Sequence, residues 1–356
     1  MKLIIPIAGS SSRFPGMRPK WMLTMPNGDL MLERAISGLK LDNISELVII
    51  ALEEHIEKFK ISKDFIIEAI KLKIAPKKIK INLEILKKKT NSQPTTIYKY
   101  LINQKEDFSF YIKDCDNYFE FEPKPGNIVS YIPLSDLYLV AAITKSYIRF
   151  NRFKEIEQIA EKSVISSNFC CGGYGFSSSK DFIKTYNELN GKDDDSLYIS
   201  HIIHKQLLEG SIFKADRAKK FEDYGTQKEY FSFIKEVSTI LSDFDGVLVE
   251  NSSKFALKPW SYIPNEANLK HLASYLEASP NSVLVITTSR PDSEKDNIER
   301  FLKSFNIECH SIVTNLPHAK RMLINDFSTT NPFPSAQSIN VPRNSQVLHE
   351  YLKTNN

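Results

Sequence analysis

Short apolar runs that alternate with helix-like stretches constrain the fold of this chain more than any other feature. Helix-like stretches such as residues 30–39 and 95–102 lie between runs rich in β-branched, aliphatic and aromatic residues. These runs comprise residues 3–8, 46–52, 79–86, 108–112 and 137–143. Buried strands that alternate with helices are typical of a mostly parallel sheet covered on both faces. We therefore predict an α/β fold for this part of the chain.

A second series of the same kind begins near residue 238, and the chain of 356 residues is longer than one hydrophobic core usually organises. A helix-like stretch, residues 266–276, lies within this series. The strands expected there are residues 239–241, 282–287 and 322–324. We predict two domains, residues 1–235 and residues 236–356.

The charge balance gives little reason to expect a polyanionic partner, because 47 basic and 43 acidic residues leave a net charge of only +4. The 4 cysteines show no metal-ligand spacing, and the adjacent Cys170 and Cys171 cannot easily form a relaxed disulfide, so a reducing compartment is expected. No apolar run is long enough to span a bilayer. We therefore expect a cytoplasmic protein with neither a nucleic acid nor a membrane as its partner; a homo-oligomer is compatible with the sequence.

The loop after the first apolar run suits a phosphate group. It contains the small residues Ala8, Gly9, Ser10 and Ser11, followed by Arg13. Backbone N–H groups beside small residues are accessible to phosphate oxygens, and a guanidinium can donate to the same anion. An ordinary turn between a strand and a helix has a similar composition, so these residues alone do not distinguish a phosphate-binding loop from such a turn. Lys20, which follows Pro19, adds a second cation a few residues later.

Further motifs follow this loop in the order found in sugar-phosphate nucleotidyltransferases, which the chain resembles. A strand-like run ends in Asp114-Cys115-Asp116-Asn117, where the resemblance favours Asp116 as a metal ligand and leaves Asp114 as the second choice. The Glu-Lys pair of the family recurs at Glu161-Lys162, and its Asp-x-Gly-Thr motif recurs at residues 223–226. The resemblance is closest to capsule-type and teichoic-type sugar or polyol cytidylyltransferases.

This resemblance implies a Rossmann-like, GT-A-like mixed sheet and a transfer from a nucleoside triphosphate, with CTP favoured, to a sugar or polyol phosphate. Arg13 and Lys20 would hold the triphosphate, and Lys162 would bind the acceptor phosphate. Asp116 and Asp223 would bind Mg²⁺. Gln93 stands where the family contacts the base, although it could equally serve only at the start of a helix.

The second series opens with a different motif, Asp243-Phe244-Asp245-Gly246, directly after an apolar run. This motif resembles the first motif of the HAD superfamily of phosphohydrolases. The resemblance implies a HAD-like α/β domain without a large cap. The resemblance implies that Asp243 attacks phosphorus and also contacts the metal, and that Asp245 acts as acid and base.

Three further residues are candidates for the phosphohydrolase site. Thr288, in a Thr-x-Arg-Pro sequence, is favoured over Thr287 as a phosphate ligand, and Lys320 is favoured over Arg321 as the balancing cation. Asp326 would complete the metal site, although Asn325 stands where many relatives have an aspartate.

Together the motifs predict a bifunctional enzyme of surface-polysaccharide precursor synthesis. It would transfer a nucleotidyl group to a sugar or polyol phosphate and hydrolyse a phosphate ester in the same pathway. Two alternatives remain at this point. The HAD-like part could be a noncatalytic module, or the first domain could be a glycosyltransferase, a class that shares the fold and the metal-binding aspartate but does not explain Arg13 and Lys20.

Overall fold

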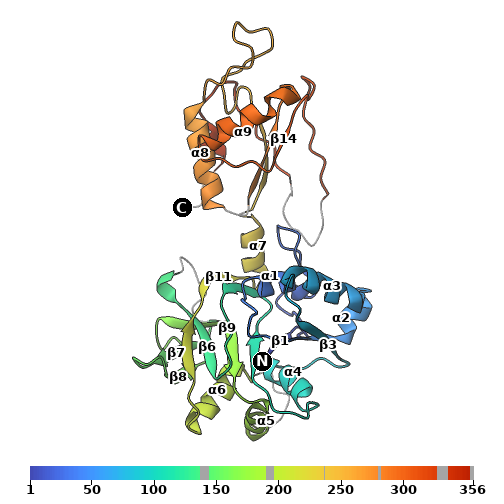
Figure 1. Cartoon of the computed structure of the whole chain (residues 1–356), viewed down its shortest axis with the longest axis vertical. Helices are drawn as coiled ribbons and strands as arrows, with labels where there is room; N and C mark the ends of the chain where they lie inside the picture. The colour runs from blue at the N-terminus through green and yellow to red at the C-terminus, as the bar shows by residue number, and fades with distance from the viewer. Residues whose placement is uncertain (137–143, 190–195, 236, 280–281, 327–335, 353–356) are drawn as a thin grey trace. The chain divides into compact units, whose positions relative to one another are not determined.

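The computed structural model describes the chain except residues 137–143, 190–195, 236, 280–281, 327–335 and 353–356. It divides into two compact units, Met1–Tyr230 and Phe231–Asn356. The division falls within helix α7 (Gln227–Lys235), whereas the sequence suggested a boundary after residue 235. Each unit is described by itself below (Figure 1).

A mixed sheet forms the centre of the first unit, with the strand order β10-β6-β9-β4-β1-β2-β3. Neighbours β4, β1, β2 and β3 run parallel, and β9 runs antiparallel to both β4 and β6. The bounds of these strands are β1 Lys2–Pro6, β2 Glu46–Leu52, β3 Lys80–Leu86, β4 Phe110–Lys113, β6 Ile128–Pro133, β9 Asn168–Phe176 and β10 Lys214–Arg217. Strands β7 (Tyr147–Phe150) and β8 (Ile156–Ala160) pair with each other, and β7 also pairs with β9.

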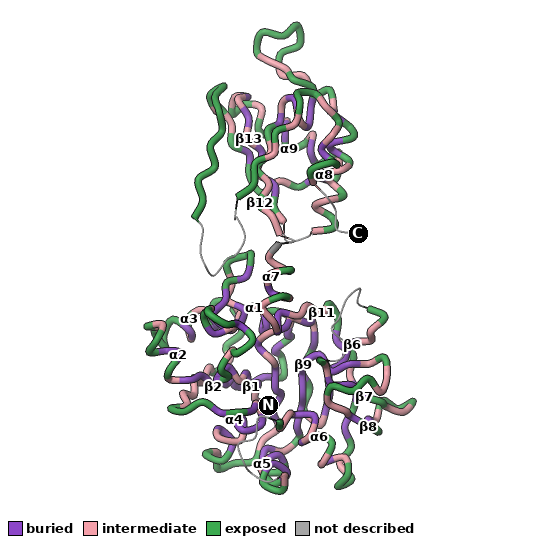
Figure 2. The backbone as a smooth tube through the Cα atoms, turned by 180° about the vertical axis from the view of Figure 1, so that it is seen from behind, coloured by how far each residue is buried: buried purple, intermediate pink, exposed green. Residues whose placement is uncertain are grey.

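Helices cover both faces of this sheet, and the alternation of strand side chains explains how. Leu3 and Ile5 of β1 pack with residues of α1 (Met31–Ser37) and α3 (Lys63–Ile74). Ile4, between them, faces the opposite cluster, which contains residues of α4 (Gln93–Leu101), α5 (Ser179–Glu188) and α6 (Ile199–Leu208). All of β2 is therefore buried, as Figure 2 shows. The prediction of an α/β fold with a mixed sheet is confirmed for this unit.

Smaller elements complete the first unit. They are the one-turn helix η1 (Lys20–Met22), helix α2 (Glu53–Lys58), the strand pair β5 (Asn117–Glu120) and β11 (Lys219–Asp223), and η2 (Leu134–Asp136). The expected strand at residues 137–143 lies outside the described residues.

The second unit contains a parallel sheet with the order β12-β13-β14, formed by Thr239–Asp243, Val283–Thr287 and Ser311–Val313. Ile286 of β13 packs in a core with residues of α8 (Glu266–Ala278) and α9 (Lys295–Lys303). The shorter elements are η4 (Asp292–Glu294) and α10 (Leu348–Tyr351).

The predicted strand at residues 322–324 is wrong. Met322, Leu323 and Ile324 form no strand, and they are 73%, 57% and 87% exposed. The third strand of this sheet is β14 instead, which pairs with β13 through Ile312 opposite Ile286. Apolarity suggested the strand at residues 322–324, but a strand also needs a neighbour for its backbone hydrogen bonds, and these residues pair with none of the described strands.

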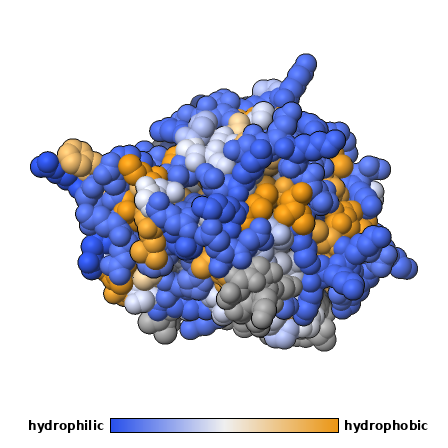
Figure 3. Space-filling view, turned by 90° about the horizontal axis from the view of Figure 1, so that it is seen from below, coloured by the Kyte–Doolittle hydropathy of each residue, from blue (hydrophilic) through white to orange (hydrophobic). Residues whose placement is uncertain are grey.

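The surface is largely polar (Figure 3), in keeping with a chain of which 25% of the residues are charged. The face seen in Figure 3 is mainly hydrophilic and carries separate patches of hydrophobic residues. Within the described part of the chain, no helix combines the length and the apolar character that a membrane span requires. Cys115, Cys170, Cys171 and Cys309 are free thiols.

Candidate active site

A cavity of about 650 Å³ opens in the first unit where the polypeptide leaves the carboxyl ends of β1 and β4. Ligand sites of α/β sheets commonly occupy this edge. The cavity brings together predicted site residues from distant parts of the sequence: Gly9, Ser10, Ser11, Arg13, Lys20, Gln93, Asp116, Lys162 and Asp223. Ala8 is buried at the end of the first strand region and does not line it.

The loop after β1 is connected directly to Lys20. Ser11 has a left-handed backbone with φ of 51°, and its Oγ accepts a hydrogen bond of 3.0 Å from the backbone N–H of Lys20. This contact fixes the start of η1 against the loop. The phosphate-binding loop and the lysine predicted to assist it therefore form one local structure.

Lys20 crosses the cavity to Asp116. Its Nζ donates to Asp116 Oδ2 at 2.6 Å, and both side chains are largely buried. Burial disfavours the charge on Asp116, but the charges of Lys20 and Arg13 outweigh it and hold the pKa of this carboxyl well below its usual range. Burial likewise opposes the charge on Lys20, yet Asp116 raises the pKa of this amine. Asp116 is therefore an ionised oxygen donor at neutral pH.

Asp223 reaches the same place from β11. A Cβ atom added to Gly225 would lie 3.1 Å from Asp223 Oδ1, 3.4 Å from Asp116 Oδ2 and 3.6 Å from Arg13 Nη1, so these three side chains converge around one glycine. The backbone N–H of Gly225 donates to Asp223 Oδ1 at 3.1 Å, and Lys145 forms an ion pair with Oδ2. The two predicted metal ligands thus lie side by side.

Asp114 has a different environment from Asp116. Its Oδ1 accepts a 2.6 Å hydrogen bond from Gln93 Nε2, at the first turn of α4. Burial, reinforced by the negative charge of Asp116, raises the pKa of Asp114. Gly172 on β9 has φ of 86°, and a Cβ there would lie 2.6 Å from Asp114 Oδ2. The glycine therefore leaves room for this carboxylate.

A buried lysine supports the turn that carries both aspartates. Lys113 donates to the backbone carbonyls of Asp114 and Asn117, at 2.7 and 2.8 Å, and to the Asn117 side chain. Burial lowers the pKa of Lys113 to about 8, although Asp114 and other nearby groups favour its charge. Lys113 acts through the backbone, as a brace for the turn.

The side of the cavity formed by β8, β9 and α6 holds the Glu-Lys pair. Glu161 accepts hydrogen bonds from Ser146 and, at 2.6 Å, from Ser200. Lys162 donates to the hydroxyl of Tyr198 and lies 4.4 Å from the centre of that ring. Lys162 is exposed to solvent at the cavity, where an incoming anion can reach it.

The carboxylate oxygens of Asp116 and Asp223 are suitable ligands for Mg²⁺. Mg²⁺ prefers oxygen ligands and is commonly held by one or two carboxylates together with water and substrate phosphates. Across the described ranges no group of three or more His, Cys, Asp or Glu side chains could hold a metal ion, so the chain offers no complete protein cage. Two converging carboxylates beside a loop suited to phosphate match the Mg²⁺ arrangement.

Comparison with known proteins supports the fold of this unit. No protein-family model matches the sequence, and no curated protein matches it. The structure of a nucleoside-diphosphate-sugar pyrophosphorylase from Vibrio cholerae RC9 superposes with a TM-score of 0.54 at 19% identity, over 65% of this chain and 99% of that one. An inositol-1-phosphate CTP transferase from T. maritima gives a TM-score of 0.50 at 14% identity, over 64% of this chain and 90% of that one.

These similarities show a shared fold. The matched share of the chain has the size of the first unit, and it spans nearly all of each sugar nucleotidyltransferase compared. The fold of this unit is therefore the one that these sugar nucleotidyltransferases have. At such low identities the residue roles rest on the geometry of the cavity.

Sequence reasoning missed Lys145 and Lys113. Both are single lysines in a chain that has 47 lysines and arginines, and neither belongs to a motif. The one available signal was the position of Lys113 at the end of an otherwise apolar strand, where a charged side chain is rarely buried without partners. Nothing in the local sequence distinguishes Lys145.

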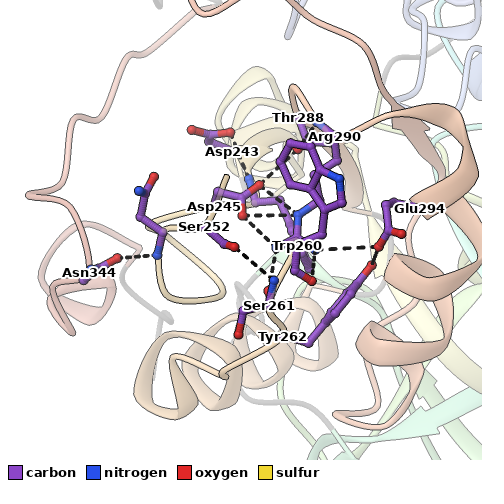
Figure 4. A network of polar contacts seen from close by, with 12 residues as sticks. Asp243, Asp245, Ser252, Trp260, Ser261, Tyr262, Thr288, Arg290, Glu294 and Asn344 are labelled. Atoms are coloured by element: carbon purple, nitrogen blue, oxygen red, sulfur yellow. Dashed lines mark hydrogen bonds and ion pairs between the residues drawn. The ribbon is translucent and has the colours of Figure 1, made fainter. Parts of the chain in front are cut away.

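In the second unit, Asp243 ends β12 and is exposed, whereas Asp245 is held by an arginine (Figure 4). Arg290, which is fully buried, donates to both oxygens of Asp245 and to the carbonyls of Trp260 and Ser261. Thr288 Oγ1 also donates to Asp245, at 3.2 Å. Thr288, Arg290 and Asp245 thus belong to one hydrogen-bond network. The Asp-x-Asp-Gly and Thr-x-Arg-Pro sequences by themselves did not indicate this contact.

Lys320 and Asp326 belong to the irregular segment after β14. Both side chains are exposed, and the segment forms no regular secondary structure. Asp326 follows residues 322–324, where the strand that the sequence suggested does not form. Partial burial of its carboxyl group raises the pKa of Asp243, and the positive charge of Arg321, the alternative cation of this motif, opposes this rise.

Proposed function

We propose that the first unit is a nucleotidyltransferase, which transfers a nucleoside monophosphate group from a nucleoside triphosphate to a sugar or polyol phosphate and releases pyrophosphate. The convergence of Arg13, Lys20, Asp116 and Asp223 at one cavity carries this proposal. Two cations and two carboxylates around one cavity are the set that phosphoryl chemistry needs, since charge must be neutralised and the reacting atoms aligned.

Each side chain has a role in the reaction. A phosphate oxygen of the acceptor attacks the α-phosphorus, the bond from that phosphorus to the oxygen bridging to the β-phosphate breaks, and pyrophosphate departs with the electron pair. Arg13 and Lys20 bind the triphosphate and stabilise the leaving group, while Gly9, Ser10 and Ser11 offer backbone N–H groups. Lys162 binds the acceptor phosphate.

Asp116 and Asp223 would hold Mg²⁺, which when bound neutralises phosphate charge and aligns the reacting oxygens. The low pKa of Asp116 suits this role, because the carboxylate needs no deprotonation before it binds a cation. CTP is the expected nucleotide, and Gln93, which lines the cavity, is the residue proposed to contact the base. The compared transferase from T. maritima is likewise described as using CTP.

A direct assay tests this function. The whole protein is incubated with each of the four nucleoside triphosphates, Mg²⁺ and a panel of phosphorylated sugars and polyols, and pyrophosphate and nucleotide-linked products are measured by mass spectrometry. We expect pyrophosphate only when an acceptor is present, and a loss of at least about a hundredfold in rate for Asp116→Asn. If no acceptor gives pyrophosphate, and the protein releases nucleoside diphosphate when a nucleotide sugar is supplied instead, the first unit is a glycosyltransferase.

We infer a second activity, hydrolysis of a phosphate ester, for the second unit. The exposed carboxylate of Asp243 at the carboxyl end of a parallel strand favours it, since that edge commonly forms the ligand site. Asp243 would attack phosphorus and form an aspartyl-phosphate, while the ester P–O bond breaks and Asp245 protonates the departing oxygen. Asp245 would then take a proton from the water that releases phosphate from Asp243. The ion pair of Asp245 with Arg290 has to loosen for these steps.

Phosphate release from sugar and polyol phosphates measures this activity. We expect release by the parent protein and none by Asp243→Asn, with the nucleotidyl transfer of the first unit unchanged. Equal phosphate release by the parent and by Asp243→Asn would leave the second unit as a noncatalytic module.

A further inference from the structure

Lysine and carboxylate pairs occur twice in the cavity, in matching arrangements. Lys20 pairs with Asp116, and Lys145 pairs with Asp223. The first lysine belongs to a motif, and the proposed function uses it. The second lysine has no assigned role, although its side chain is only 19% exposed and lines the same cavity.

The pair of Lys145 with Asp223 occupies the carboxylate that the proposed function assigns to a metal. Asp223 Oδ1 accepts from the backbone of Gly225, and Oδ2 is paired with Lys145. A cation that binds at Oδ2 must therefore displace the ammonium group of Lys145.

The residues next to Lys145 link it to the side of the cavity that holds the Glu-Lys pair. Ser146, the next residue, donates to Glu161, which precedes Lys162. The amine also lies 5.6 Å from the ring centre of Phe221, another residue of the cavity wall. A displaced Lys145 would thus remain within the cavity, beside the anions that the reaction brings there.

We propose that Lys145 is a further catalytic residue: it pairs with Asp223 and binds phosphate oxygens of the reacting groups once a divalent cation takes its place at this carboxylate. This rests on the proposed nucleotidyl transfer. An ammonium group donates readily to phosphate oxygens and screens the repulsion between two anionic substrates. The same exchange keeps Asp223 paired with a cation before and after metal binding.

If a divalent cation replaces Lys145 at Asp223, removal of the lysine charge should strengthen metal binding and weaken catalysis. Lys145→Met keeps much of the side-chain length and removes the charge. Without nucleotide, Mn²⁺ should bind to Lys145→Met about tenfold more tightly than to the parent, because no ammonium competes for Asp223. The probe is Mn²⁺ itself, followed by electron paramagnetic resonance in titrations of the full chain.

Three variants serve as controls. Lys145→Arg keeps the charge and should bind Mn²⁺ as weakly as the parent. Asp223→Asn combined with Lys145→Met should remove the gain, which assigns it to this carboxylate. Lys214→Met removes a lysine that pairs with Glu155 outside the cavity and should change neither Mn²⁺ binding nor activity. Circular dichroism confirms that each variant is folded.

Catalysis provides the second measurement. With Mg²⁺, nucleoside triphosphate and acceptor phosphate, Lys145→Met should lower kcat by about a hundredfold, whereas Lys145→Arg should retain most of it. Unchanged or weaker Mn²⁺ binding by Lys145→Met, or full activity of that variant, would overturn the role of Lys145. If the parent makes no pyrophosphate with any substrate, the proposed function fails, and the Mn²⁺ titration still decides whether Lys145 competes for Asp223.

Discussion

Asp114 and Asp116 show how neighbours determine the chemistry of identical side chains. Both carboxylates are buried, and burial alone raises the pKa of each. Asp116 faces Lys20 and Arg13, so its pKa falls. Asp114 has the negative charge of Asp116 beside it, and the hydrogen bond from the neutral Gln93 does not offset burial and this charge, so its pKa rises. The Asp-x-Asp sequence therefore contains one carboxylate fit for a cation and one that is costly to keep ionised.

The raised pKa of Asp114 predicts a pH-dependent stability. The pKa of this carboxyl is higher in the folded protein than in the unfolded chain. Above the folded-state pKa the carboxyl is ionised in both states, and its buried charge destabilises the fold. This cost is lost as the pH falls through the folded-state pKa and below the unfolded-state pKa of 3.8. Asp114→Asn should therefore increase the free energy of unfolding at neutral pH, by about 1–3 kcal/mol. Urea unfolding at several pH values measures it; a stabilisation that grows towards acid pH would contradict this account.

Gly172 gives a test of the space around Asp114. Gly172→Ala would place its Cβ 2.5 Å from Asn117 Nδ2 and 2.6 Å from Asp114 Oδ2, in a left-handed backbone. Gly28→Ala is the matched control, because Gly28 has φ of 87° and no atom within 4 Å of its Cβ position. We expect Gly28→Ala to cost about 1 kcal/mol from backbone strain, and Gly172→Ala clearly more. Equal costs in thermal unfolding would show that the carboxylate moves aside freely.

Helix α4 shows, at the scale of an element, how a helix start can also form part of a site. Ser92 precedes the helix, its Oγ accepts from the backbone N–H of Thr95 at 3.4 Å, and Pro94 lies in the first turn. Ser92 and Gln93 both line the cavity. The residues that begin the helix thus also form a wall of the proposed nucleotide site.

Removal of this cap should affect binding as well as stability. Ser92→Ala is expected to destabilise the first unit by about 1 kcal/mol and to weaken nucleotide binding, because Gln93 loses its fixed position. Ser178→Ala removes the corresponding cap of α5, where Ser178 Oγ accepts a 3.0 Å hydrogen bond from the backbone N–H of Asp181. Ser178 does not line the cavity. It should have a similar cost in stability and no effect on nucleotide affinity. Calorimetric titration with CTP distinguishes the two variants.

Across the whole molecule, the division into two units follows from separate cores. The first unit has a cluster on each face of its sheet, and the second unit has a cluster of its own. A unit with its own core can unfold by itself. The proposed transferase and phosphohydrolase sites each lie within one of these units.

Scanning calorimetry can test the independence of the cores. Ile49 in the first unit and Ile286 in the second are both fully buried. Each Ile→Ala substitution should cost about 2–5 kcal/mol and lower the midpoint of one unfolding transition only. A common transition that shifts equally in both variants would show that the two units unfold together.

The amino-acid sequence determined the elements and the chemistry-bearing motifs of this protein. Strand β2 occupies residues 46–52, as predicted, because strands and helices are recorded in the spacing of nearby residues. The motifs that resemble those of sugar-phosphate nucleotidyltransferases also indicated which residues to seek in the cavity.

The tertiary structure alone decided the partners of those residues. Lys20 meets Asp116 across 96 positions, Lys145 meets Asp223 across 78 and Arg290 meets Asp245 across 45. Such contacts depend on the order of the strands in the sheets, which local spacing does not specify. The same reason explains the failure at residues 322–324, where an apolar run has no strand beside it among the described residues.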